Sequence, residues 1–233
     1  MAPSPGAPEP APRGRLAAWL RETVIIVVSA LVLSMLIKTF LVQSFYIPSG
    51  SMEDTLEIGD RVLVTKLAPG PLGLHRGDIV VFKDPGGWLS PTAVVERTGW
   101  RGAVADTLTF VGLMPQDSGE HLIKRVIGLA GDTVACCDAQ GRLTVNGIPL
   151  DEPYLAPGAE PSEMEFSVVV PEGRLWVMGD NRQNSQDSRY KQGDPGGGAI
   201  PRANVVGVAF VTLWPIDRWT VLHNPGATFA EVP

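Results

Sequence analysis

An apolar segment near the N-terminus, TVIIVVSALVLSMLIKTFLVQ at residues 23–43, constrains this chain more than any other feature. In a helix it would rise about 31 Å, which matches a bilayer core of roughly 30 Å. Lys38 is its one charge and lies near its end, where a long side chain reaches the membrane interface. We expect a transmembrane helix over residues 23–43, preceded by a disordered, proline-rich cytoplasmic tail over residues 1–22.

A cleaved signal peptide is the alternative interpretation of the same segment. Signal peptides end in a small-x-small cleavage site, but KTFLVQSFYIPSG follows this apolar core, so we favour an uncleaved anchor. Arg13, Arg15 and Arg21 precede the segment, and the positive-inside rule keeps that end in the cytoplasm. Residues 44–233 then form an extracytoplasmic domain, held at the cell membrane by a single pass.

The sequence after the anchor is typical of β structure. It is rich in β-branched residues, and the 26 glycines and 21 prolines of the chain favour turns over long helices. The fold class that we expect is mainly β. Residues 103–113 are compatible with a short helix or a strand, and residues 193–201 with a loop. The expected strands lie within residues 61–67, 78–84, 121–129, 142–150, 166–170, 174–179 and 205–214.

Composition argues against several classes of protein. The net charge of −6 is unfavourable for a general nucleic-acid surface. The only two cysteines, Cys136 and Cys137, are adjacent, which excludes a disulfide scaffold and a four-cysteine zinc site. His75, His121 and His223 do not have metal-ligand spacing. We therefore expect no metal and no cofactor.

The segment IPSGSMEDTL, residues 47–56, is the first of three that can carry chemistry. Ser49 and Ser51 face the same side of an extended chain, and Gly50 between them lets a substrate backbone approach closely. If Ser51 is a nucleophile, its backbone N–H and the Ser49 hydroxyl are candidates to hold the developing oxyanion. A serine-rich turn after an anchor accounts for the segment equally well.

HLIKRVIGLAGD, residues 121–132, contains a lysine among apolar residues. On a strand, Leu122 and Val126 share a face with Lys124, while Ile123 and Arg125 take the other face. Desolvation lowers the pKa of a lysine, and a neutral amine can act as a general base. The alternative is an edge-strand lysine in water.

GDNRQNSQDSR, residues 179–189, is an unusually polar loop after an apolar run. Asp187 and Arg189 are spaced to form an ion pair, and Ser185 can donate a hydrogen bond to an amine. A surface loop stabilised by Asx turns is the alternative.

The order PSGSM, KRVIGLAGD and GDNRQNSQDSR behind a membrane anchor resembles bacterial type I signal peptidases over residues 20–222. The resemblance implies a membrane-anchored protein with a large coiled antiparallel β-sheet and a smaller β cap region. It also implies a Ser/Lys dyad that removes signal peptides from exported preproteins. The implied partners are these preproteins and the lipid bilayer, with no nucleic acid, and the chain is expected to be a monomer without cofactors.

The resemblance also assigns roles by motif position. Ser51 would be the nucleophile and Lys124 the general base, with Ser49 completing the oxyanion hole beside the Ser51 N–H. Ser185 would orient Lys124. The salt bridge of Asp187 and Arg189 would hold the site together, Asp180 and Arg182 would support the loop, and small apolar substrate pockets would be lined by Ile47, Met52, Leu56, Leu122 and Ile123.

The chain departs from this pattern in places. Asp54 stands where the family usually has proline, Ala130 replaces another proline, and residues 190–201 are longer and richer in glycine. An anchored binding or assembly module with an altered site is therefore one alternative. A self-cleaving Ser/Lys regulator of related fold is another, although such proteins are soluble. Because Ser51 follows the span closely, we also expect Phe45, Met52 and Leu56 to contact lipid.

Overall fold

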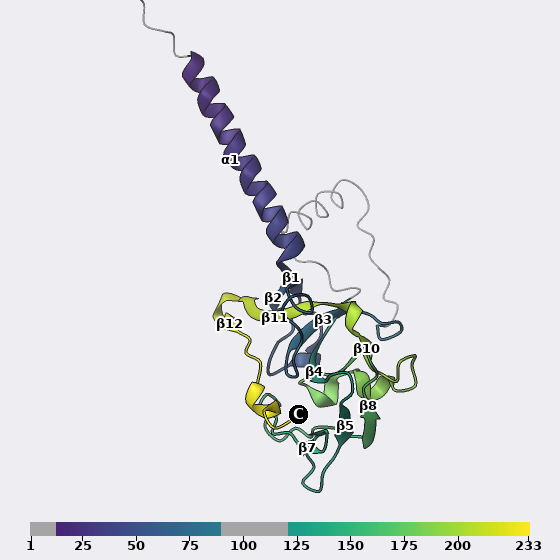
Figure 1. The fold of residues 1–233 in the computed structure, drawn as a ribbon. Helices are drawn as coiled ribbons and strands as arrows, with labels where there is room; N and C mark the ends of the chain where they lie inside the picture. Colours follow the sequence, from purple (N-terminus) through teal and green to yellow (C-terminus); the bar gives the residue numbers. More distant parts are fainter. Residues whose placement is uncertain (1–12, 90–120) are drawn as a thin grey trace, which may run out of the picture.

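The structure is a computed structural model, which describes residues 13–89 and 121–233; the expected element at residues 103–113 lies outside them. Helix α1 (Arg13–Phe40) stands clear of the β structure (Figure 1). Within it, Ala17–Ile37 is long and apolar enough to cross a membrane, and none of this stretch is buried against the protein. The helix begins before residue 23, where the expected span starts. It ends at Phe40, before the expected end at residue 43, because residues 42 and 43 already belong to strand β1.

The described residues form a large antiparallel sheet of eight strands, in the order β1-β2-β11-β3-β4-β9-β10, with β12 paired to β11. Register shifts interrupt the pairing of β11 with β2 and β3, and of β4 with β9. Such bulges increase the local twist, so the sheet curls. Its strands are β1 (Val42–Tyr46), β2 (Arg61–Thr65), β3 (Ile79–Lys83), β4 (His121–Gly128), β9 (Arg174–Met178), β10 (Ile200–Pro201), β11 (Val205–Trp214) and β12 (Thr220–Val221).

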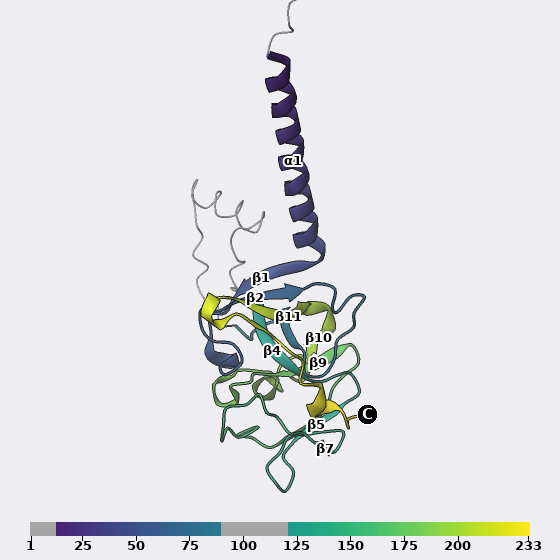
Figure 2. The same ribbon diagram turned by 90° about the vertical axis from the view of Figure 1, so that its left-hand side faces the viewer.

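A smaller antiparallel sheet, in the order β7-β6-β5-β8, lies at the end of the molecule remote from α1 (Figure 2). Asn146 and Gly147 both have positive φ and form the two-residue turn between β6 and β7. The run expected over residues 142–150 is therefore two short strands. The sheet contains β5 (Thr133–Cys136), β6 (Thr144–Val145), β7 (Ile148–Pro149) and β8 (Phe166–Val169).

Apolar residues cover both faces of the large sheet at its centre. On β3, Ile79 and Val81 join one cluster, whereas Val80 and Phe82 join another on the opposite face. A third cluster fills the space between the two sheets, where Phe166 stacks on Trp176 with ring centroids 5.4 Å apart. Strand β4, between β3 and β9, is thus an interior strand, and polar side chains on it are removed from water.

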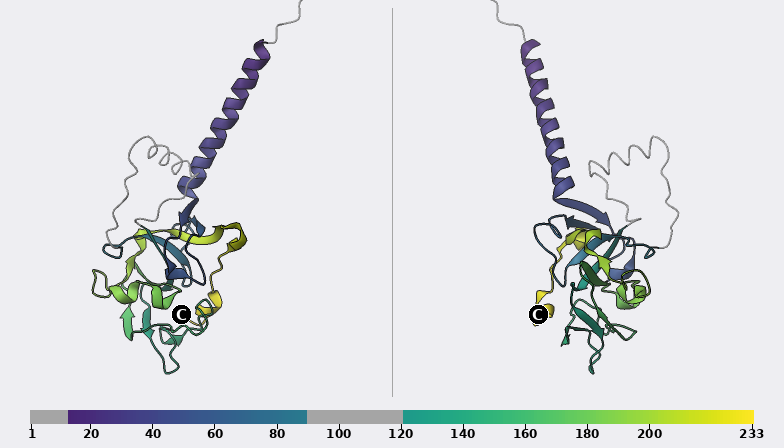
Figure 3. Two further views of the ribbon diagram at one scale, coloured as in Figure 1. Left: turned by 180° about the vertical axis from the view of Figure 1, so that it is seen from behind. Right: turned by 45° about the vertical axis from the view of Figure 1, so that its right-hand side comes forward.

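The mainly β fold class is confirmed, with one N-terminal apolar helix. Strands β2, β3, β4, β8, β9 and β11 occupy the expected runs. Strands β1, β5, β10 and β12 were not expected. Figure 3 shows from two sides that α1 meets the large sheet at the end where β1, β2 and the turn between β11 and β12 lie.

Candidate active site

Ser51 and Lys124, which are 73 residues apart in the sequence, are in direct contact. Ser51 lies in a short 3₁₀ helix, η1 (Gly50–Met52), and Lys124 lies on β4, paired with Val80 of β3. The Lys124 Nζ atom donates a hydrogen bond of 2.5 Å to the Ser51 Oγ atom. Ser51 is 6% exposed and Lys124 is 3% exposed. The fold therefore brings a hydroxyl and an amine together in a place largely closed to water.

The surroundings of Lys124 suit an amine that is neutral for part of the time. Its Nζ atom also donates to the Ile123 carbonyl oxygen at 3.0 Å. Burial lowers the pKa of Lys124 to about 8, although the Asp187 and Asp180 carboxylates raise the pKa in part. An edge-strand lysine in water is excluded, since β4 has a neighbouring strand on each side. Such an amine can accept a proton near neutral pH.

The charged side chains of the polar loop at residues 179–189 are buried, although Gln183, Asn184 and Gln186 are exposed, so a surface loop is the wrong interpretation. Asp187 and Arg189 form a two-pronged ion pair, with N–O distances of 2.9 Å at both prongs. Neither side chain is accessible to solvent. Asp187 also accepts a hydrogen bond of 3.0 Å from the Gly179 backbone N–H. The pair thereby fixes the loop to the end of β9.

A second buried ion pair joins the loop to β4. Arg125 donates to both carboxylate oxygens of Asp180, at 2.8 and 2.5 Å. The Thr55 hydroxyl donates to the same carboxylate at 2.6 Å, and the Tyr154 ring lies 4.1 Å from the Arg125 guanidinium. Asp180 therefore connects β4 to the segment that follows Ser51. Arg125 and Thr55 were not expected in this network, because sequence spacing does not indicate their partner.

Arg182 connects the same loop to Glu152. It donates to the Glu152 carboxylate at 3.0 and 2.6 Å and to the Gly179 carbonyl oxygen at 3.0 Å. Burial alone would lower the pKa of Arg182, but the Glu152 carboxylate, together with Tyr154 and Asp180, raises it overall. Burial raises the pKa of Tyr154 well above its usual value, and the Glu152 carboxylate adds to this rise. Arg182 thus stays charged and anchors the loop.

Two further serines were expected to assist Ser51 and Lys124: Ser185 is buried, whereas Ser49 is exposed. The Ser185 Oγ atom is buried and has no hydrogen-bond partner among the described residues, so the expected hydrogen bond to Lys124 is not formed. Gly179 lies between Ser185 and Ser51, and a Cβ atom there would collide with the Ser185 hydroxyl and the Ser51 carbonyl oxygen. Ser49 is exposed and extended, directly before η1.

The expected pocket residues divide between two clusters. Ile47, Met52, Leu56 and Ile123 pack in the cluster that contains Phe45, whereas Leu122 packs on the opposite face of the sheet. The expected lipid contact of Phe45, Met52 and Leu56 is wrong, because all three side chains are buried in the core.

Exposed apolar side chains lie instead around the turn between β11 and β12. Trp214 is 52% exposed, Ile216 77% and Trp219 58%. This turn is at the end of the sheet where α1 joins it (Figure 3). The aromatic residues of LWPIDRW were the available signal in the sequence.

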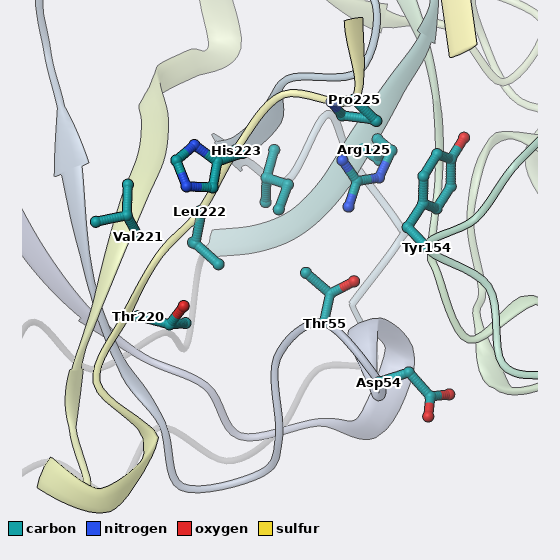
Figure 4. Close-up of a pocket in the computed structure, with 10 residues that line it drawn as sticks. Asp54, Thr55, Arg125, Tyr154, Thr220, Val221, Leu222, His223 and Pro225 are labelled. Carbon is teal, nitrogen blue, oxygen red and sulfur yellow. The ribbon is translucent and has the colours of Figure 1, made fainter. Parts of the chain in front are cut away.

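A cavity of about 260 Å³ lies beside Thr55, Arg125 and Tyr154 (Figure 4). Asp54 is at its rim and Thr55 points toward Arg125 (Figure 4). Since Arg125 follows Lys124 on β4, the two side chains leave the strand on opposite faces. The described residues contain no group of three side chains arranged to hold a metal ion.

An antiparallel β domain in which a buried lysine amine contacts a serine hydroxyl has the features of a peptidase that activates serine with lysine. Residues 20–214 match the family described as signal peptidase, peptidase S26. The chain belongs to this family, and the resemblance expected from its motifs is confirmed.

Similar proteins cover most of the chain. A probable signal peptidase I of Mycobacterium leprae is 40% identical over 240 residues, which cover 89% of this chain and 80% of that protein. A signal peptidase I of Mycobacterium tuberculosis is 40% identical over 236 residues, which cover 93% of this chain and 79% of that protein. A crystal structure of a signal peptidase I from Enterococcus faecalis is 30% identical, covers 58% of this chain and 95% of that chain, and has a TM-score of 0.37.

Proposed function

We propose that this chain is a membrane-bound endopeptidase that removes signal peptides from exported preproteins, with Ser51 as its nucleophile and Lys124 as its general base. Membership of the family supports the serine endopeptidase activity. The assignment of the two residues rests on one observation, the buried 2.5 Å contact between the Lys124 Nζ and Ser51 Oγ atoms. No cofactor is needed for this chemistry.

The first half of the reaction forms an acyl-enzyme. The neutral Lys124 amine accepts the Ser51 proton while the Ser51 Oγ atom attacks the carbonyl carbon before the cleaved bond. The Ser51 backbone N–H and the Ser49 hydroxyl donate to the oxygen that becomes negative. Lys124, now an ammonium, gives its proton to the leaving amine of the mature protein.

The second half hydrolyses the ester. Lys124 is again neutral and accepts a proton from a water molecule, whose oxygen attacks the acyl carbon. The bond from this carbon to the Ser51 Oγ atom then breaks, the Lys124 ammonium returns the proton to Oγ, and the signal peptide leaves with a free carboxylate. We propose that Ser185, whose buried hydroxyl oxygen has no partner among the described residues, accepts a hydrogen bond from a Lys124 N–H and so points the lone pair of the neutral amine at the group that it deprotonates. The ion pairs of Asp187 with Arg189 and of Asp180 with Arg125 keep the two strands and the loop in register.

The substrate is proposed to place small side chains beside Ser51. Met52 follows Ser51 in η1 and packs in the same apolar cluster as Ile47, Leu56 and Ile123, so the proposed pocket is lined by apolar side chains. A lysine side chain next to the cut would lose its hydration without gaining a partner. Leu122 shares a face of β4 with Lys124 and packs in a different apolar cluster from Ile123.

The membrane arrangement follows from α1. Its apolar stretch is proposed to cross the bilayer with the N-terminus in the cytoplasm, because basic residues precede it. Trp214, Ile216 and Trp219 then face the outer leaflet, where aromatic rings are favoured. The active site lies in the same domain, on the side to which exported precursors are delivered.

The test uses the full chain in detergent and a precursor with Ala-x-Ala before its mature start. The parent protein is expected to cut after the second alanine, whereas Ser51→Ala and Lys124→Ala are expected to be inactive. Circular dichroism would check that both variants stay folded. Full activity of either variant would refute the dyad, and cleavage at unrelated positions would refute the substrate class.

A further inference from the structure

One residue of the loop, Asn181, contacts the backbone on both sides of Ser51. Its side-chain Nδ2 atom donates to the Gly50 carbonyl oxygen at 3.0 Å. Its backbone N–H donates to the Ser51 carbonyl oxygen at 3.2 Å. Asn181 thus binds the two peptide groups that Ser51 connects, and it lies 131 residues away from Gly50 in the sequence.

Glu53 holds the Asn181 amide in place. Its Oε2 atom accepts a hydrogen bond of 2.8 Å from the same Nδ2 atom, and its backbone N–H donates to the Gly50 carbonyl oxygen at 3.2 Å. Both partners of the amide are acceptors, so only the NH₂ end of Asn181 satisfies them. The Glu53 carboxylate packs over Gly50 so closely that a Cβ atom at Gly50 would collide with it.

The planarity of the peptide bond connects the hydrogen bonds at the Gly50 oxygen to the orientation of the Ser51 N–H. The Gly50 carbonyl and the Ser51 N–H belong to one rigid trans unit and point in opposite directions. Two hydrogen bonds that fix the Gly50 oxygen therefore fix the direction of the Ser51 N–H. Donation to the carbonyl also polarises the peptide group, which makes its N–H a better donor.

We propose that Asn181 is a positioning residue for the oxyanion hole, and that Glu53 orients Asn181 for this task. The proposal rests on the proposed function, since it takes the Ser51 N–H as an oxyanion donor. Asn181 and Glu53 do not touch the reacting atoms. Their contribution appears when the carbonyl oxygen of the substrate becomes negative. A misdirected Ser51 N–H weakens binding of the oxyanion strongly, but it weakens binding of the neutral carbonyl group only slightly.

The experiment compares Asn181→Ala with the parent in steady-state cleavage of a precursor peptide by the full chain. We expect kcat to fall about 10²-fold, the size typical for loss of an oxyanion donor, with KM changed less than about threefold. Binding of a peptide aldehyde, which forms a tetrahedral adduct with the serine, should weaken in parallel with kcat. The acid-limb pKa of the rate profile should stay at the parent value, because Lys124 is untouched.

Three further variants separate positioning from general damage. Asn181→Asp keeps the shape but places a carboxylate against Glu53 and the Gly50 oxygen, so it should be at least as impaired as Asn181→Ala. Glu53→Gln keeps an acceptor for Asn181 and should retain most of the activity, unlike Glu53→Ala. Asn184→Ala is the matched control, an exposed asparagine of the same turn, and should behave as the parent.

Each outcome separates this proposal from the function on which it rests. An Asn181→Ala enzyme with unchanged kcat, beside an inactive Ser51→Ala enzyme, overturns the positioning role and leaves the dyad standing. A loss of kcat with unaltered aldehyde affinity also overturns it, since the defect then lies outside the oxyanion hole. Activity of Ser51→Ala would instead overturn the proposed function itself.

Discussion

The Nζ atom of Lys124 lies 2.5 Å from the Oγ atom of Ser51, with both side chains almost closed to solvent. Lys124 lies on an interior strand, so water has little access to its ammonium group. Burial is the main cause of the lowered pKa of Lys124, and the proposed role of its amine as a base depends on that shift.

The first prediction concerns pH. Burial lowers the pKa of Lys124 from 10.5 to about 8. Activity should therefore rise with pH as the amine loses its proton, with an acid limb near pH 8 in a profile of kcat/KM against pH. An acid limb near 10 would contradict a buried base.

The same lowered pKa predicts a change in stability. In the folded protein the charged form is disfavoured, so below pH 8 Lys124 destabilises the fold, and this cost disappears as pH rises toward 10.5. Lys124→Met should be inactive yet more stable at pH 7, by at most about 3 kcal/mol. Urea unfolding at pH 7 and pH 10 measures the effect, and the two proteins should converge at the higher pH.

The second residue to test is Gly179. A methyl group there would collide with the Ser51 carbonyl oxygen and the Ser185 hydroxyl. Gly179→Ala should lose about 1–3 kcal/mol of stability and most of its activity, because the nucleophile must shift. Gly193→Ala is the matched control, since a Cβ atom at Gly193 meets nothing within 4 Å. Equal activity of the two variants would contradict this prediction, because it would mean that the loop accommodates the added methyl group without moving Ser51.

Breaking the ion pair of Asp187 and Arg189 should be costly. Both side chains are fully buried, so Asp187→Asn leaves a guanidinium without its counter-charge. We expect a loss of about 3–5 kcal/mol in urea unfolding. The double variant Asp187→Leu with Arg189→Met should be more stable than Asp187→Asn, because no lone charge remains. A double variant that is the less stable of the two would contradict this reasoning.

Asp54 offers a test of backbone geometry. Its φ angle is +75°, a conformation that proline, fixed near −65°, does not adopt. Asp54→Pro would restore the usual family residue and yet should destabilise the protein, by about 1 kcal/mol or more. Asp54→Gly should preserve or raise the melting temperature. A stabilised Asp54→Pro protein would show that this segment has a different conformation.

The exposed turn between β11 and β12 predicts a difference between substrates. Replacing Trp214, Ile216 and Trp219 with serine should slow cleavage of a precursor embedded in vesicles several-fold. Cleavage of a short peptide in detergent should not change, since the turn is not part of the dyad. Val169→Ser is the control, because Val169 is also well exposed but belongs to strand β8 of the small sheet, which lies away from α1 (Figure 1).

Much of the fold was predictable from local pattern. Strand β11 begins and ends where its apolar run does, and the apolar segment marks α1 to within a few turns. Strand β1 was missed because its residues continue the apolar segment. Strands β10 and β12 contain two residues each, too few to show any alternation.

The site was predictable only in part. The motifs pointed to Ser51 and Lys124, and the apolar flanks of Lys124 indicated its lowered pKa. Spacing alone does not bring together residues 73 positions apart. The partners of Asp180, namely Arg125 and Thr55, arise from long-range pairing, as does the contact of Asn181 with Gly50. The burial of Met52 was likewise invisible, since an apolar residue after a turn suits a core and a surface equally well.

The junction of α1 and β1 has a consequence for how the enzyme chooses its cut. Only Leu41 separates the end of the helix at Phe40 from the start of β1, and β1 is an edge strand of the sheet that carries Lys124. The helix and the catalytic domain are therefore joined without a tether, and the anchor sets the height of Ser51 above the lipid. With α1 in the bilayer as proposed, we expect the enzyme to select precursors by how far they emerge from the membrane as well as by the side chains that they present.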